Sequence, residues 1–168
     1  MAVSELSADL QADVETLATA LRARGWMLTT AESCTGGLIS AACTSLAGSS
    51  DWFERGFVTY SNAAKSDWLG VPEALIAQHG AVSEEVARAM AEAALTRSKA
   101  QVSVAVTGVA GPGGGSFAKP VGTVWMAVGK VGGTTEAELL QLAGDRAAVR
   151  AQTVARAVNA VIKAANAT

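Results

Sequence analysis

The sequence contains few of the residues that form disulfides, metal sites and histidine-based catalytic centres. Its 168 residues include two cysteines and one histidine. Cys34 and Cys43 fall in a segment that we interpret as one helix, on opposite faces and about 13 Å apart along its axis, which is too far for a disulfide. We therefore expect reduced thiols in a reducing compartment. One histidine and two separated cysteines give no metal-ligand spacing, so we expect no metal site.

Long apolar runs and a strong net charge are also missing. No stretch of about 18 apolar residues occurs, and the N-terminus carries acidic residues where a signal peptide has a basic region. We therefore expect no membrane-spanning helix, no signal peptide and a cytoplasmic location. The net charge is −2 and no run of Lys or Arg exceeds two residues, which argues against nucleic acid or an anionic membrane as a partner. The sequence leaves open whether the chain forms a homo-oligomer.

What is present is typical of one compact domain spanning residues 1–168, because half of the residues are hydrophobic and 17% are charged. Apolar spacing and turn residues predict strands at 26–31, 53–60, 101–107, 122–131 and 134–142, the last two joined by a Gly132-Gly133 turn. They predict helices at 3–24, after ESCTGG to near 46, at 61–69, after Pro72, from Ser83 through 99 and from Asp145 onward. This alternation predicts a three-layer α/β/α sandwich around a mixed, mostly parallel sheet.

Two glycine-containing loops follow predicted strands, at residues 32–37 and 107–115. Ligands of open α/β sheets gather at the carboxyl ends of strands, and glycine lets the backbone approach them closely. Neither loop matches the phosphate-binding loop of nucleotide hydrolases or the dinucleotide fingerprint, so no cofactor is expected. Ser33 and Thr35 are equally well explained as helix N-caps.

A serine nucleophile needs a base, and Lys65 is a better candidate than His79, which we place at the exposed end of a short helix. Burial among Tyr60 and Trp68 would lower the pKa of Lys65 and let it accept a proton. A solvated helix position is the alternative for Lys65. The hydroxyl of Tyr60, the only tyrosine, could complete a proton relay or bind substrate, with core packing as the alternative.

Two further considerations concern charge. The carboxylates of Glu32 or Asp67, if close to Lys65, would raise its pKa, and we expect desolvation to outweigh them. Arg146 and Arg150 lie four residues apart near the start of the last helix, where positive charge opposes the helix dipole. An anionic ligand would explain these arginines, and so would pairing with Asp145 or Glu138.

The tryptophans are given no role in binding. Trp52, Trp68 and Trp125 are assigned to the core. The contribution of Cys34, next to the candidate nucleophile, is left open.

Five segments resemble, in order and spacing, the C-terminal domain of the competence/damage-inducible CinA family, and they span Thr30 to Ala165. They are TAESCTGGLIS, FVTYSNAAKSDWLGV, HGAVSEEVARAMAE, VTGVAGPGGGSFAKPVGTVW and GDRAAVR. This family includes stand-alone nicotinamide-nucleotide amidohydrolases and has a three-layer α/β/α fold. Larger members carry an N-terminal molybdopterin-binding-like domain, for which we expect no room in 168 residues.

The resemblance implies hydrolysis of the carboxamide of nicotinamide mononucleotide to nicotinate mononucleotide and ammonia, as part of pyridine-nucleotide salvage. It implies a serine/lysine mechanism in which Ser33 attacks, Lys65 carries the proton and Tyr60 helps. The backbone amides of Thr35, Gly36 and Gly37 would donate hydrogen bonds to the oxyanion that forms during the reaction. The phosphate of the substrate would be bound by Arg146 or by the second loop, at Thr107, Gly108 and Gly111.

Two alternatives to this activity belong to different classes. A non-catalytic nucleotide-binding module, linked to competence or DNA damage, would be expected to lose Ser33 or Lys65, and both are present. An amidohydrolase acting on another small amide stays open, because specificity depends on the shape of the pocket.

We expect nicotinamide mononucleotide to be hydrolysed much better than nicotinamide riboside, because charge-assisted contacts from the glycine loop or Arg146 require an anion. Arg146→Ala should weaken binding of the mononucleotide and leave the riboside nearly unaffected. The measurement is kcat/KM for both substrates from ammonia release, and equal values for the two would contradict the prediction.

Overall fold

A five-stranded sheet with the order β2-β1-β3-β4-β5 forms the centre of the molecule. The computed structural model describes residues 6–167. The strands are β1 (Leu28–Glu32), β2 (Phe53–Val58), β3 (Val102–Gly108), β4 (Thr123–Lys130) and β5 (Glu136–Gln141). β1 pairs in parallel with β2 and β3, whereas β4 pairs antiparallel with β3 and with β5. β4 therefore runs against the other four strands, which confirms the mixed, mostly parallel sheet.

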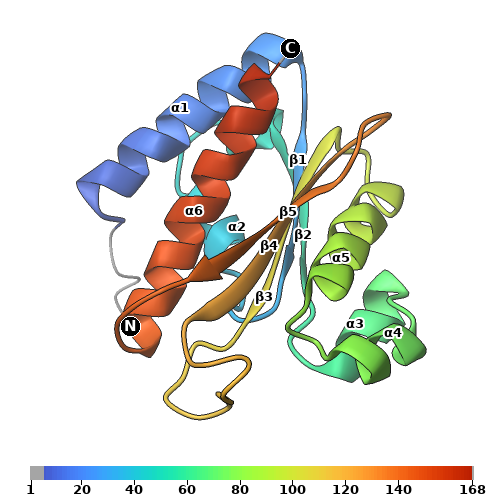
Figure 1. Ribbon diagram of the computed structural model, residues 1–168. Helices are drawn as coiled ribbons and strands as arrows, with labels where there is room; N and C mark the ends of the chain where they lie inside the picture. The colour runs from blue at the N-terminus through green and yellow to red at the C-terminus, as the bar shows by residue number, and fades with distance from the viewer. Residues whose placement is uncertain (1–5, 168) are drawn as a thin grey trace.

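Helices cover both faces of this sheet, so the three-layer sandwich is confirmed. They are α1 (Ala8–Arg24), α2 (Leu38–Thr44), α3 (Asn62–Leu69), α4 (Glu73–His79), α5 (Glu84–Thr96) and α6 (Arg146–Asn166), with a short 3-10 helix at Ser49–Asp51. Figure 1 shows α1, α2 and α6 on one face and α3, α4 and α5 on the other. Within residues 6–167, no helix is both long and apolar enough to cross a membrane.

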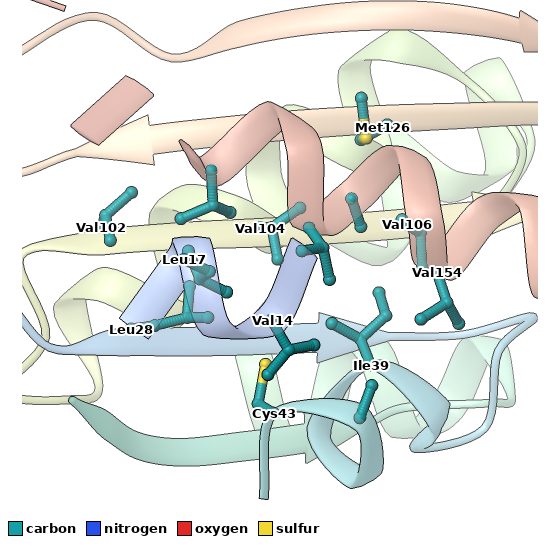
Figure 2. Close-up of a cluster of buried hydrophobic side chains, with 14 of the residues drawn as sticks. Val14, Leu17, Leu28, Ile39, Cys43, Val102, Val104, Val106, Met126 and Val154 are labelled. Carbon is teal, nitrogen blue, oxygen red and sulfur yellow. The ribbon is translucent and has the colours of Figure 1, made fainter. Parts of the chain in front are cut away.

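The central strand β3 is buried on both faces, as expected for a strand with helices on either side. Val102, Val104 and Val106 point toward α1 and α6 and share a cluster with Val14 and Leu17 of α1, as Figure 2 shows. On the opposite face, small side chains let α5 approach the sheet closely, namely Ala87, Ala91, Ala94, Ala105 and Ala127. A rigid β3 holds the loop that follows it in a defined place.

Local capping residues set most helix ends. The side chains of Ser61, Ser83 and Asp145 each accept a hydrogen bond from a backbone N–H in the first turn of α3, α5 and α6, and Gly25 ends α1 in the left-handed conformation. These predicted boundaries are confirmed. The first helix is observed from Ala8, and residues 3–5 of its predicted range lie outside the described part of the chain.

The helix predicted after ESCTGG is confirmed as α2, but Cys34 does not belong to it. Gly36 and Gly37 have φ of 57° and 104°, so the helix cannot extend back through these two residues. α2 therefore begins at Leu38, and no side chain caps it from the Gly37 position. Cys34 therefore lies in a turn, and the prediction that Cys34 and Cys43 share one helix was wrong. Both thiols are free and buried.

Gly122, at the start of β4, needs to be a glycine for two reasons. Its φ is 95°, and a Cβ there would overlap the carbonyl oxygen of Leu142. Gly132, in the β4–β5 turn, has φ of 73° with no atom within 4 Å of a Cβ. We expect Gly132→Ala to lower the free energy of unfolding by about 1–2 kcal/mol through backbone strain alone. Gly122→Ala should lower it by about 2 kcal/mol more, since the overlap also displaces the paired backbone. Urea denaturation of both variants measures this, and equal losses would contradict it.

Candidate functional site

A cavity of about 200 Å³ opens where the strand order reverses. The chain continues from β1 to β2 on one side of β1, whereas β3 lies on the other side, so the loops after β1 and β3 diverge and leave a crevice between them. Its wall comes from the segments that follow the ends of β1, β2 and β3, from the turn before α5 and from the start of α6. The lining residues are Ser33, Cys34, Tyr60, Asn62, Lys65, Ala81, Val82, Thr107, Gly108, Ala110 and Arg146.

Ser33 and Lys65 are in direct contact at this cavity. The amine nitrogen Nζ of Lys65 lies 2.9 Å from Oγ of Ser33, and it also lies 3.0 Å from the carbonyl oxygen of Thr59 and 3.1 Å from that of Tyr60. A neutral amine has two N–H bonds and one lone pair. In the structure Nζ donates to all three oxygens, and the Ser33 hydroxyl donates to the Tyr60 carbonyl at 3.4 Å. Once neutral, the amine would keep its N–H bonds on the two carbonyls and turn its lone pair to the Ser33 hydroxyl, as a general base requires.

Burial lowers the pKa of Lys65 below its ordinary value of 10.5, with the charge of the neighbouring Cys34 as a smaller opposing effect. The side chain is 1% exposed, and a buried amine disfavours its charged form. The direction and the cause expected from the sequence, desolvation, are both confirmed, but two of the expected neighbours were wrong. The rings of Tyr60 and Trp68 are 59% and 69% exposed, so the side chain is instead buried between α3 and the ends of the strands.

Cys34 lines the same cavity, but its thiol is not activated. Burial raises the pKa of Cys34 to about 11, and the charge of Glu32 acts in the same direction. A protonated thiol is a weak nucleophile. Ser33, with the amine of Lys65 at 2.9 Å, is therefore the better candidate for nucleophilic attack.

The turn that carries Ser33 is fixed on several sides. The N–H of Ser33 donates to the carbonyl of Val106 in β3 at 3.1 Å. The carboxylate of Glu32, which is fully buried, accepts the hydroxyl of Thr35 and two backbone N–H groups of α2. From the sequence, Glu32 was expected only as a neighbour of Lys65, and this role was missed. An acidic residue just before a glycine-rich helix start was the available signal.

Arg150 also holds this turn from the side of α6. Its Nε and Nη2 donate to the carbonyls of Cys34 and Thr35, both at 3.2 Å. Neither acidic partner considered for it is used, because Asp145 caps α6 through the N–H of Ala148 and Glu138 lies 4.0 Å from Arg156. The alternative that one of these carboxylates pairs with Arg150 was therefore wrong, and an outside anion as its partner stays a prediction.

The remaining predicted residues of the first loop, Thr35, Gly36 and Gly37, do not line the cavity. Thr35 is buried and its hydroxyl is 2.6 Å from the Glu32 carboxylate. Gly36 and Gly37 shape the backbone through their positive φ, and none of the three lines the cavity. Their part in binding an oxyanion stays a prediction.

At the mouth of the cavity, Arg146 joins two segments. It donates through Nη2 to the hydroxyl of Tyr60 at 3.1 Å and through Nη1 to the carbonyl of Gly111 at 2.9 Å. The Tyr60 hydroxyl thus contacts Arg146, and it is the backbone carbonyl of Tyr60 that contacts Lys65. Thr107 and Gly108 line the cavity. Arg146 is the one predicted anion-binding side chain that lies at the opening.

Other candidates lie away from this site. Nδ1 of His79 is 3.6 Å from the carboxylate of Glu85, and His79 does not line the cavity. Trp52 is buried in the core and Trp125 is partly buried against it, as expected, whereas Trp68 lies on the surface. Among residues 6–167, no three His, Cys, Asp or Glu side chains come together as a group that could bind a metal ion.

Comparisons with known proteins place this geometry in a family. The CinA C-terminal domain matches residues 10–165. The nicotinamide-nucleotide amidohydrolase PncC of Enterobacter agglomerans is 56% identical over 133 residues, covering 79% of this chain and 81% of its own. PncC of Escherichia coli K12 is 53% identical over 144 residues, covering 86% and 87%. The crystal structure of the competence/damage inducible protein CihA from Agrobacterium tumefaciens superposes with a TM-score of 0.94 at 44% identity, covering 98% of this chain and 100% of that one. The chain therefore belongs to the CinA C-terminal domain family.

Proposed function

We propose that this protein is an amidase that hydrolyses the carboxamide of nicotinamide mononucleotide, giving nicotinate mononucleotide and ammonia. The observation that carries the proposal is the 2.9 Å contact between the buried amine of Lys65 and the hydroxyl of Ser33 at a cavity. The PncC relatives, which are named nicotinamide-nucleotide amidohydrolases, support the choice of substrate.

The size of the cavity fits one part of this substrate. At about 200 Å³ it is smaller than the pockets of roughly 300–1,000 Å³ that enclose whole ligands. The flat nicotinamide ring enters it with the carboxamide next to Ser33. The ribose and the phosphate lie at the mouth, where Arg146 and the glycine-rich loop after β3 supply a guanidinium and backbone N–H groups.

Ser33 and Lys65 carry the reaction in two halves. The Ser33 hydroxyl attacks the carboxamide carbon while its proton passes to neutral Lys65. Lys65 then delivers this proton to the departing nitrogen, which leaves as ammonia, and the acyl group remains as an ester on Ser33. Water next attacks the ester, with Lys65 accepting its proton and returning it to Ser33. The acid is released and both side chains regain their starting state.

Other parts of the proposal concern the residues around this pair and the setting of the enzyme. Backbone N–H groups in the turn at 35–37 would stabilise the oxyanion, and Tyr60 would align Arg146 at the mouth. The enzyme would act in the cytoplasm without nucleic acid as a partner. A non-catalytic nucleotide-binding module is not favoured, because such a module has no use for a buried amine next to a serine hydroxyl.

Ser33→Ala should abolish ammonia release from nicotinamide mononucleotide, by at least about 10³-fold in kcat, because the nucleophile is lost. The assay compares nicotinamide mononucleotide, nicotinamide riboside and free nicotinamide, with Ser45→Ala at the end of α2 as a control that should keep its activity. Near-wild-type turnover in Ser33→Ala would make the nucleophile assignment wrong, and Cys34 would be tested next. No release from any of the three amides by the wild type would overturn the proposed substrate.

Activity should rise with pH through a single ionisation, because only neutral Lys65 accepts the serine proton. Since burial lowers the pKa of Lys65, the midpoint in kcat/KM should lie below that of an ordinary lysine, with activity lost as pH falls through it. Lys65→Arg should be nearly inactive at every pH, because a guanidinium keeps its proton. Lys163→Arg on the exposed side of α6 is the control. Substantial turnover by Lys65→Arg would show that the base lies elsewhere.

A further inference from the structure

Glu32 is a fully buried carboxylate that the proposed reaction does not use. It is the last residue of β1, directly before Ser33, and 0% of it is exposed. Among residues 6–167, it forms no ion pair with a lysine, arginine or histidine. A buried carboxylate without a counter-ion is unfavourable unless hydrogen bonds replace its hydration. A residue kept in this state beside the nucleophile calls for an explanation.

Four hydrogen bonds surround this carboxylate. Oε1 accepts the Thr35 hydroxyl at 2.6 Å and the N–H of Ile39 at 2.8 Å, and Oε2 accepts the N–H and hydroxyl of Ser40 at 3.0 and 2.7 Å. The two N–H groups belong to the first turn of α2, which has no side-chain cap of its own. Glu32 therefore caps α2 from outside the helix, and the positive end of the helix dipole favours its charge.

Residues on two strands extend this network away from the cavity. The hydroxyls of Thr30 and Ser40 are 2.8 Å apart. Because Ser40 gives its proton to Glu32, the Thr30 hydroxyl donates to Ser40. Gly56 of β2 lies opposite Thr30, and a Cβ there would come within 2.5 Å of Ser40 Oγ and 2.8 Å of Thr30 Oγ1. A glycine at this point of β2 therefore leaves the space that the two hydroxyls occupy.

The main chain of Glu32 connects with the other half of the catalytic pair. Its carbonyl accepts the N–H of Thr59 at 2.9 Å, and the carbonyl of Thr59 accepts Lys65 Nζ at 3.0 Å. Glu32 is thus bonded to α2 through its side chain, to the acceptor of Lys65 through its carbonyl, and to Ser33 through the peptide bond.

We propose that Glu32 is a positioning residue for the amide hydrolysis proposed above. It holds the turn that carries Ser33 against α2, so that the Ser33 hydroxyl stays within hydrogen-bonding distance of the Lys65 amine. This role rests on the proposed function. Glu32 touches neither substrate nor the reacting atoms. Its loss misplaces the nucleophile and leaves the base and the phosphate contacts intact, so the change appears in kcat and in the reactivity of Ser33.

The test is Glu32→Gln, because glutamine has nearly the same shape. Its amide oxygen still accepts hydrogen bonds, but its NH₂ group replaces the second carboxylate oxygen and faces donors that it cannot accept from. We expect kcat to fall about 10- to 100-fold, with KM and the pH midpoint of kcat/KM unchanged. Labelling of Ser33 by a fluorophosphonate should slow in parallel. Glu15→Gln, on the exposed face of α1, is the matched control and should behave as the wild type in all four measurements.

A second variant keeps the proposal testable if Glu32→Gln does not fold. Ser40→Ala removes one hydroxyl donor to Glu32 and keeps the backbone N–H. Its kcat and its labelling rate should therefore fall by the same factor as each other, and by a smaller factor than in Glu32→Gln. Lower thermal stability with wild-type kcat and labelling, in whichever variant folds, would overturn the proposal and leave Glu32 a purely structural residue.

Fluorophosphonate labelling separates this inference from the substrate assignment. It requires only an activated Ser33, so slowed labelling of Glu32→Gln would support the positioning role even if no nicotinamide compound releases ammonia. Labelling at the wild-type rate in Glu32→Gln would contradict the positioning role, whichever amide proves to be the substrate.

Discussion

The contact between the buried amine of Lys65 and the hydroxyl of Ser33 is the interaction that the site depends on. Burial disfavours the charged form of this amine and lowers its pKa, and two backbone carbonyls accept hydrogen bonds from it. This arrangement needs Lys65 on α3 and Ser33 after β1 to meet at one end of the sheet. The reversal of strand order between β1 and β3 provides that meeting point.

The structure keeps two ionisable side chains of opposite sign apart on either side of Ser33. An ion pair between Glu32 and Lys65 would raise the pKa of the amine and remove the base. Instead the Glu32 carboxylate is bonded to α2 on one face of the sheet, whereas Lys65 lies on α3 at the other face (Figure 1). Burial, and not a neighbouring carboxylate, is the main influence on the pKa of Lys65. Hydrogen bonding of Glu32 to α2 thus keeps this carboxylate from raising the pKa of Lys65.

Two arginines one helical turn apart on α6 have different tasks. Arg150 donates to two carbonyls of the Ser33 turn from inside the molecule. Arg146 lies at the mouth, where it contacts the Tyr60 hydroxyl and the Gly111 carbonyl. A guanidinium that joins two segments through neutral acceptors keeps its full charge available to a phosphate. The start of α6 therefore connects the turn that carries Ser33 with the region where the nucleotide would lie.

The sequence by itself determined the features that depend on neighbours along the chain. Ser61, Ser83 and Asp145 cap helices and Gly25 ends one, because caps rely on contacts within a few residues. The β-branched run of β3 marks a buried strand through its composition. The order of helices and strands then determined the sandwich and the end of the sheet at which loops meet. Ser33 and Lys65 could be named from their chemistry and from the resemblance to the CinA family.

Tertiary structure alone decided which side chains surround that pair. Tyr60 and Trp68 were expected around Lys65 and are exposed, because α3 turns Lys65 inward and Trp68 outward. Arg150 bonds to carbonyls more than 100 positions away in sequence, and Glu32 bonds to a helix whose start depends on two glycines with positive φ. Hydrogen bonds between distant segments have no periodic pattern along the chain. They exist only once packing has brought the segments within about 3 Å of each other.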